Sequence, residues 1–151
     1  MQTSRSNLSI KKQNVSFPDV KFKCIRCGNC CRNTDRVERR IVLTKKDVET
    51  IHSATRLRIE DFADRNNNEN YPYAIKLVSE KCFFLDANNT CLVYSYRPLV
   101  CRFYPFLLRK IGTKYVFDVD PSCPGLGNGE NIDEKYFIKL IREAEKHLGS
   151  F

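Results

Sequence analysis

The stretch KCIRCGNCCR at residues 23–32 places four cysteines within eight positions, and the last two are adjacent. Four more cysteines follow in the rest of the chain. The complete set is Cys24, Cys27, Cys30, Cys31, Cys82, Cys91, Cys101 and Cys123. Cys-x-x-Cys spacing suits metal binding, because a tight loop directs both sulfurs toward one point. The sequence therefore predicts metal-binding loops with all eight cysteines as ligands.

A disulfide framework is the alternative use of these cysteines, since their number is even. The first 20 residues lack the apolar core of a signal peptide, and intracellular thiols are usually kept reduced. A bond between the adjacent Cys30 and Cys31 would also be strained. We therefore expect a cytoplasmic, metal-binding protein. Disulfide-rich intracellular proteins of hyperthermophiles are the exception that stays open.

The spacing of the cysteines also suggests how they divide among metal centres. Cys-x-x-Cys-x-x-Cys with a remote Cys-Pro resembles a bacterial ferredoxin run and would group Cys24, Cys27, Cys30 and Cys123. The second group would then be Cys31, Cys82, Cys91 and Cys101. Side chains of neighbouring residues usually diverge. We therefore expect Cys30 and Cys31 to supply ligands to two metal centres or to one polynuclear centre.

The identity of the metal stays open between iron and zinc. Both accept four thiolates in a tetrahedral array. The chain contains only His52 and His147, and each falls on a predicted helix, so mixed cysteine-histidine zinc sites have few candidates. An all-cysteine set fits a 4Fe-4S iron-sulfur cluster and structural zinc alike, and iron-sulfur is the interpretation that we favour.

Hydrophobic periodicity and turn residues predict short elements along the chain. The expected strands and hairpins cover 39–44, 73–78, 81–98 (turning at 86–90) and 107–120. The expected helices cover 45–54, 59–64 and 133–148, and a glycine- and proline-rich loop is expected at 121–131. The pattern predicts a small single α+β domain with short strands and hairpins, two or three helices and irregular cysteine-rich metal-binding loops.

Polarity and charge indicate how the chain is divided into segments and which partners it could bind. Residues 1–20 are polar without a clear period and are expected to form a flexible leader, followed by a metal-binding domain at 21–151. No run of about 18 apolar residues predicts a membrane span. Metal-bound thiolates would balance part of the formal charge of +8. The rest is compatible with an acidic protein or nucleic acid as partner.

Three segments together resemble a known family. They are CIRCGNCCR, then CFFLDANNTCLVYSYRPLVCRFYPF, then a later cysteine. This pattern is similar to the YkgJ-like cysteine-cluster family, the zinc- or iron-chelating domain with a Cys-x-x-Cys-x-x-Cys-Cys motif, over about residues 22–125. The resemblance implies an eight-cysteine metal site. A similar domain occurs in flagellin lysine-N-methylases, and this resemblance implies methyl transfer as a further alternative. However, the sequence has no glycine-rich loop after a strand, which a methyl-donor site would need.

Three arginines lie beside cysteines: Arg32, Arg97 and Arg102. Their guanidinium groups could donate hydrogen bonds to thiolate sulfurs and so bind the cofactor. We apply this interpretation mainly to Arg97 and Arg102. The alternative is that these arginines lie solvated on the surface. The sequence thus predicts a metal-binding protein, with an iron-sulfur centre in a redox or enzyme-supporting role. A structural-zinc module that binds protein or nucleic acid is the second hypothesis. Whether the chain is itself an enzyme stays open.

Overall fold

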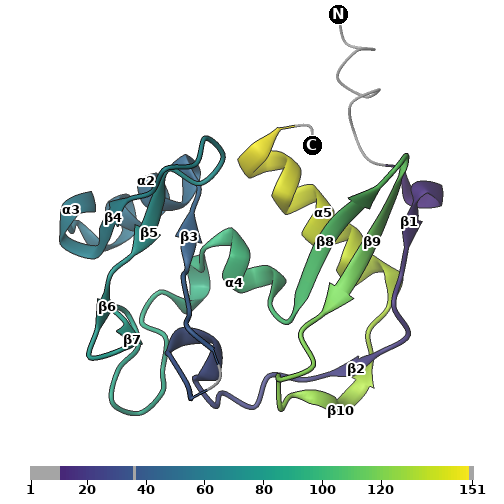
Figure 1. The fold of residues 1–151 in the computed structure, drawn as a ribbon, viewed down its shortest axis with the longest axis horizontal. Helices are drawn as coiled ribbons and strands as arrows, with labels where there is room; N and C mark the ends of the chain where they lie inside the picture. The colour runs from purple at the N-terminus through teal and green to yellow at the C-terminus, as the bar shows by residue number, and fades with distance from the viewer. Residues whose placement is uncertain (1–10, 36, 150–151) are drawn as a thin grey trace, which may run out of the picture. The chain divides into compact units, whose positions relative to one another are not determined.

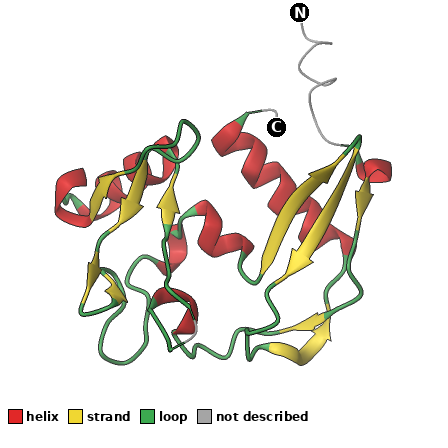
Figure 2. Cartoon of the chain, viewed as in Figure 1, coloured by secondary structure: helices red, strands yellow, loops and turns green. Residues whose placement is uncertain are grey.

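The computed structural model describes residues 11–35 and 37–149, which Figures 1 and 2 draw by chain position and by secondary structure. Residue contacts divide the chain into two compact units. Unit 1 contains the chain up to Cys24 and from Phe103 onward, and unit 2 contains Ile25–Arg102. Both units combine helix with short strands, which confirms the predicted α+β class.

Unit 1 is built on the antiparallel hairpin of β8 (Phe106–Ile111) and β9 (Lys114–Val119), as the sequence predicted. A 3-10 turn, η1 (Lys12–Asn14), leads into β1 (Val15–Ser16), which pairs parallel with β9. Strand β2 (Lys21–Phe22) pairs antiparallel with β10 (Leu126–Asn131). The chain then enters α5 (Glu134–Leu148), the long yellow helix in Figure 1.

The core of unit 1 is aromatic. The ring of Phe137 on α5 lies 5.0 Å from Phe106 and 4.8 Å from Phe117, measured between ring centroids. These residues are buried, so the apolar face of α5 packs against the hairpin. The carboxylate of Asp133 accepts a hydrogen bond of 3.0 Å from the Tyr136 amide and fixes the start of the helix.

Unit 2 contains a three-stranded antiparallel sheet and several short helices. The sheet order is β3 (Val42–Leu43), β5 (Tyr73–Ile75), β4 (Ala63–Arg65), and the nearby hairpin is β6 (Leu77–Val78) with β7 (Lys81–Cys82). The helical elements are η2 (Asn29–Cys31), α2 (Lys45–Thr55), α3 (Ile59–Phe62), η3 (Tyr94–Tyr96) and α4 (Leu99–Phe103).

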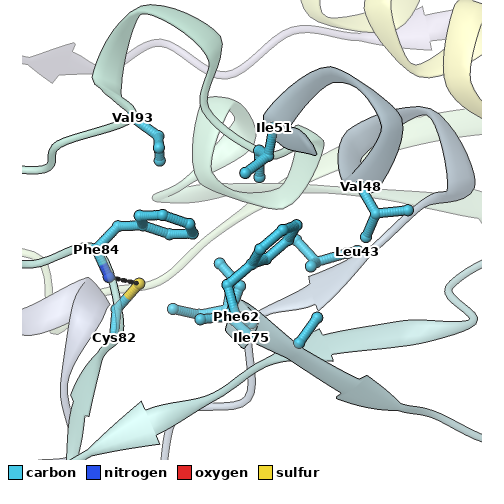
Figure 3. Packing of buried hydrophobic residues seen from close by; sticks show 10 residues of the cluster. Leu43, Val48, Ile51, Phe62, Ile75, Cys82, Phe84 and Val93 are labelled. Carbon is cyan, nitrogen blue, oxygen red and sulfur yellow. Dashed lines mark hydrogen bonds between the residues drawn. The ribbon is translucent and has the colours of Figure 1, made fainter. Parts of the chain in front are cut away.

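An apolar cluster forms the core of unit 2, and Figure 3 shows Cys82 among its members. The labelled residues are Leu43, Val48, Ile51, Phe62, Ile75, Cys82, Phe84 and Val93. Cys82 is 6% exposed. Three further cysteines, Cys31, Cys91 and Cys101, are partly buried and pack against this cluster. Several predicted metal ligands therefore lie beside the core of this unit.

The buried carboxylate of Asp47 connects two helices of unit 2. Its Oδ2 accepts a hydrogen bond of 2.9 Å from the Thr44 amide, while the Asp47 amide donates to Thr44 Oγ1 at 3.1 Å, a complete capping box at the start of α2. Its Oδ1 accepts a hydrogen bond of 3.1 Å from the Leu99 amide. The start of α4, the helix that carries Cys101, is therefore tied to the start of α2.

The structure differs from the sequence expectations in several segments, of which three are the largest. Residues 121–131 were expected to be a loop, but Leu126–Asn131 form β10, because residues far away in the sequence supply the pairing strand β2. The second strand expected within 81–98 is replaced by an isolated bridge between Leu85 and Cys91, followed by η3. Helix α4 was not expected, since its five residues are too few for a periodic pattern.

The expected leader at 1–20 is only partly described. Residues 1–10 lie outside the described part of the chain, whereas residues 12–16 form η1 and β1, and Val15 is buried against β9. The second half of that stretch therefore belongs to unit 1. No helix within residues 11–35 and 37–149 has both the length and the apolar character that crossing a bilayer requires.

Candidate metal centre

Six of the eight cysteines lie in unit 2. Three come from the loop that ends in η2, and the others from β7, from the end of the 86–90 turn and from α4: Cys27, Cys30, Cys31, Cys82, Cys91 and Cys101. No disulfide bond joins any of the eight cysteines. The structure thus contains eight separate cysteine side chains and no disulfide framework.

The ligand loop, residues 27–31, is shaped by Gly28 and by hydrogen bonds. Gly28 has a φ of 77°, a left-handed conformation that suits glycine. Its carbonyl accepts a hydrogen bond of 3.0 Å from the Cys31 amide, which closes the 3-10 turn. The Asn29 amide lies 3.4 Å from Cys27 Sγ and donates to it. This contact helps to orient the Cys27 sulfur.

The adjacent cysteines do not diverge, contrary to the expectation from the sequence. Cys30 Sγ and Cys31 Sγ lie 3.8 Å apart, and both residues belong to the 3-10 turn η2. Two thiolates on one tetrahedral ion, each about 2.3 Å from the metal, are separated by about 3.8 Å. The pair therefore has the spacing of two ligands to one metal ion.

Strand register brings later cysteines to the same loop. Arg32 forms an antiparallel bridge with Lys81, and the Asn33 amide donates to the Glu80 carbonyl at 2.8 Å. This register places Cys31 opposite Cys82. The Phe84 amide contacts Cys82 Sγ at 3.5 Å (Figure 3). Pairing between distant segments therefore assembles this part of the site.

The pKa values of four thiols show that they are electrostatically close to one another. Burial raises the pKa of Cys82 from 9.0 to about 11, and it raises the pKa of Cys91. Burial is also the main cause of the raised pKa of Cys101, followed by the charges of Cys82, Cys30 and Cys91. The hydrogen bond with Cys31, and then burial, raise the pKa of Cys30. Without a cation, the thiols are therefore held in their neutral form.

Cys24 and Cys123 lie in unit 1, near a close backbone contact. The Lys23 amide donates to the Gly125 carbonyl at 3.1 Å. A Cβ at Gly125 would stand 2.5 Å from the Lys23 carbonyl oxygen, so only glycine fits this approach. Cys24 follows Lys23 directly, and Cys123 precedes Gly125 by two residues. The pairing of β2 with β10 thus brings these two predicted ligands into one region of unit 1.

The chemistry of the donor set fits a metal that prefers sulfur. Within residues 11–35 and 37–149, no three cysteine, histidine, aspartate or glutamate side chains converge closely enough to enclose an ion. The unit 2 thiols nevertheless form an all-sulfur group, as zinc and iron-sulfur centres use. Arg32 Nε and Arg97 Nε are buried and have no hydrogen-bond partner in the described structure. Metal-bound thiolates would supply the negative charge that such donors need.

The two arginines that were predicted to bind the cofactor, Arg97 and Arg102, make different contacts. The guanidinium of Arg97 stacks 4.0 Å from the centre of the Tyr94 ring, and its charge lowers the pKa of Cys91, although burial raises that pKa more. The Nε of Arg102 donates to the Arg97 carbonyl at 2.9 Å. Arg97 therefore faces the thiol group of unit 2, and Arg102 supports the backbone of Arg97.

Sequence reasoning missed one residue of this region, Asn89. Its side-chain oxygen accepts a hydrogen bond from Arg32 Nη2. The turn that holds Asn89 was predicted from its Asp-Ala-Asn-Asn-Thr composition, and the structure contains it. Its contact with Arg32 could not be predicted, because 57 positions separate the two residues.

Comparison with known proteins identifies the family of this chain. The profile of the family described as "Putative zinc- or iron-chelating domain", with the motif name CxxCxxCC, matches residues 23–124. The chain belongs to this family, which confirms the resemblance seen in the sequence and a metal-binding role. An uncharacterized protein of Methanocaldococcus jannaschii is 27% identical over 160 residues, which cover 99% of this chain and 84% of that protein. No solved structure matches the chain.

Proposed function

We propose that this chain is a metal-binding protein whose cysteine cluster holds a 4Fe-4S iron-sulfur centre with a redox or enzyme-supporting role. The observation that carries the proposal is the grouping of thiols in unit 2. Cys30, Cys82, Cys91 and Cys101 interact electrostatically, and Cys31 touches Cys30. This group contains the four thiolates that a 4Fe-4S cluster needs as ligands.

The burial of these thiols supports a redox role. Cys82 is buried, whereas Cys30, Cys31 and Cys91 are partly exposed. A centre with such ligands lies close enough to the surface for electron exchange, and its polar surroundings tune the reduction potential. The bound cluster would supply electron transfer, while Arg97 would stabilise the thiolate of Cys91 by its positive charge. The absence of disulfides supports the reducing cytoplasm as the location.

Structural zinc is the second candidate, and the spacing of Cys30 and Cys31 favours it. Their 3.8 Å separation equals the edge of a tetrahedral zinc-thiolate site, whereas a cubane cluster binds each thiolate at a different iron and spreads the thiolates further apart. A zinc-stabilised unit would leave the basic surface to an acidic protein or nucleic acid. Nothing in the described residues favours methyl transfer over these two functions.

Anaerobic purification followed by metal and sulfide analysis separates the candidates. We expect a brown protein with visible charge-transfer absorption and stoichiometric iron and sulfide. A colourless protein with stoichiometric zinc would reject the iron-sulfur proposal and support the structural one. A protein with neither metal would reject both.

Substitution of a ligand connects the metal to the proposed site. We expect Cys101→Ser to reduce the metal content, because it removes a thiolate from the group in unit 2. Val100→Ser is the matched control, since it adds a hydroxyl to the preceding position of α4, where Val100 is also partly buried against the core. Equal metal loss in both variants would assign the effect to folding and count against Cys101 as a ligand.

A further inference from the structure

Arg32 connects the ligand loop to the turn that follows β7. Its Nη2 donates a hydrogen bond to the side-chain oxygen of Asn89. Gly28 lies against this pair, because a Cβ built on Gly28 would be 3.0 Å from Asn89 Oδ1 and 3.1 Å from Arg32 Nη2. The guanidinium group of Arg32 is therefore held beside the backbone of the ligand loop.

The turn presents Asn89 through its own hydrogen bonds. Asp86 Oδ1 accepts from the amides of Asn88 at 2.8 Å and Thr90 at 2.9 Å, and the Asn89 amide donates to the Asp86 carbonyl at 3.1 Å. Asn89 has a φ of 61°, a left-handed conformation that asparagine adopts more readily than most residues. The turn thus holds the backbone of Asn89 independently of Arg32.

A buried donor of Arg32, its Nε–H, has no partner among the described residues. A buried, unpaired N–H of a charged group is costly, so this arrangement favours a state in which an anion accepts from it. Arg32 directly follows Cys31, and thiolates of a metal-bound ligand loop are such acceptors.

We propose that Asn89 is a positioning residue, which holds Arg32 so that its Nε–H and its charge stabilise the thiolates of the metal-loaded ligand loop. The inference rests on the proposed metal-binding function. It assigns a role to the 86–90 turn, which contains no cysteine. Asn89 acts only through Arg32, so the effects of the two residues on metal affinity should not add.

The test uses Zn²⁺ alone as the probe, added to the reduced, metal-free full chain in competition with a coloured chelator. Asn89→Gly removes the side chain and keeps a residue that accepts the left-handed φ. Arg32→Gln removes the charge. We expect each to weaken Zn²⁺ binding by roughly tenfold to a hundredfold, the usual effect of residues that support metal ligands. The double variant should bind no more weakly than Arg32→Gln alone.

Two further variants keep the test independent of folding. Asn88→Gly alters the same turn beside the contact and should bind Zn²⁺ like the unaltered protein. Arg32→Lys leaves the turn intact and keeps the charge without the planar fork, so it should recover part of the affinity that Arg32→Gln loses. Circular dichroism of the zinc-loaded proteins compares their folds.

The outcomes distinguish this inference from the proposed function. Failure of the unaltered chain to bind Zn²⁺ would contradict metal binding itself. Normal binding by Asn89→Gly, additive losses in the double variant, or an equal loss in Asn88→Gly would overturn the role of Asn89 while leaving metal binding in place.

Discussion

Gly28 has a φ of 77° in the ligand loop, and its missing side chain leaves space that Arg32 and Asn89 occupy. Gly28→Ala would place a methyl group 3.0–3.1 Å from both and would strain the left-handed backbone. We therefore expect it to weaken Zn²⁺ binding by roughly tenfold or more, measured by chelator competition.

Gly127→Ala is the matched control for this substitution. Gly127 has a φ of 84°, and a Cβ there meets no atom within 4 Å, so the change adds backbone strain without a contact. We expect Gly127→Ala to lower the melting temperature but to leave zinc affinity unchanged. A similar loss of affinity in both variants would show that backbone strain alone explains the result for Gly28.

At the scale of single residues, the sequence predicted the candidate ligands but not how they are arranged. Cys-x-x-Cys spacing is a local signal, and it indicated residues 27–31 as a candidate ligand loop. The convergence of Cys30 and Cys31 was not predicted, because it depends on the side-chain conformations of two neighbouring residues, which the spacing does not report. The role of Asn89 depends on a partner 57 positions away, which no local pattern reports.

At the scale of elements, Asp47 joins α2 to α4. Asp47→Ala would leave the buried amides of Thr44 and Leu99 without their acceptor. We expect a loss of about 2–4 kcal/mol in the free energy of unfolding, measured by urea titration. Metal affinity should also fall, because α4 carries Cys101.

Asp61 provides the comparison for Asp47, since it occupies the same third position in the capping box of α3. Its carboxylate accepts from the Arg58 amide at 2.9 Å, but it is partly exposed, and its hydrogen bonds and ion pair are with Arg58, at the start of the same helix. Asp61→Ala should destabilise the protein much less and leave metal affinity unchanged. If both variants lost stability and affinity equally, the connection between α2 and α4 would not explain the effect.

The elements that the sequence predicted correctly are those with local signals. The capping box and apolar spacing indicated α2, helical periodicity indicated α5, and Gly112 marked the turn of the β8–β9 hairpin. Strand β10 was read as a loop because its glycine-rich sequence has no strand pattern. Its pairing with β2 comes from a segment about a hundred residues earlier.

At the scale of the whole molecule, the buried thiols make the stability of the metal-free protein depend on pH. Because burial raises the pKa of Cys82 from 9.0 to about 11, the folded chain keeps this proton where the unfolded chain loses it. Stability should therefore fall as pH rises from about 9 to 11, by about 2–3 kcal/mol for Cys82. Urea unfolding across this range measures the change.

Cys82→Ala separates this effect from other groups that titrate in the same range. The variant lacks the thiol, so its stability should fall less steeply with pH than that of the unaltered chain. Its stability should still fall with rising pH, because the pKa values of Cys101 and Cys91 are also raised. An identical slope in both proteins, or stability that rises with pH, would be inconsistent with a buried neutral thiol at position 82.

Removal of the metal should loosen the segments that carry the unit 2 cysteines. Thiolate-bound metal contributes to folding where the apolar core is small. We expect amides of η2, β7 and α4 to exchange at least about tenfold faster with solvent deuterium after chelation. Amides of α5, which carries no cysteine, should change less. Equal exchange with and without metal would show that the fold does not depend on it.

The register that places Cys31 opposite Cys82 also has a consequence for when metal can bind during protein synthesis. A metal bound by both residues would close a loop of about fifty residues. Such a cross-link lowers the conformational entropy of the unfolded chain, which would stabilise the folded protein by about 4 kcal/mol. The chain leaves the ribosome from its N-terminus, so the ligand loop emerges well before Cys82 and Cys101. If Cys82 and Cys101 are ligands, as proposed, a metal ion that meets the growing chain finds an incomplete ligand set, and loading would be completed only after α4 has emerged.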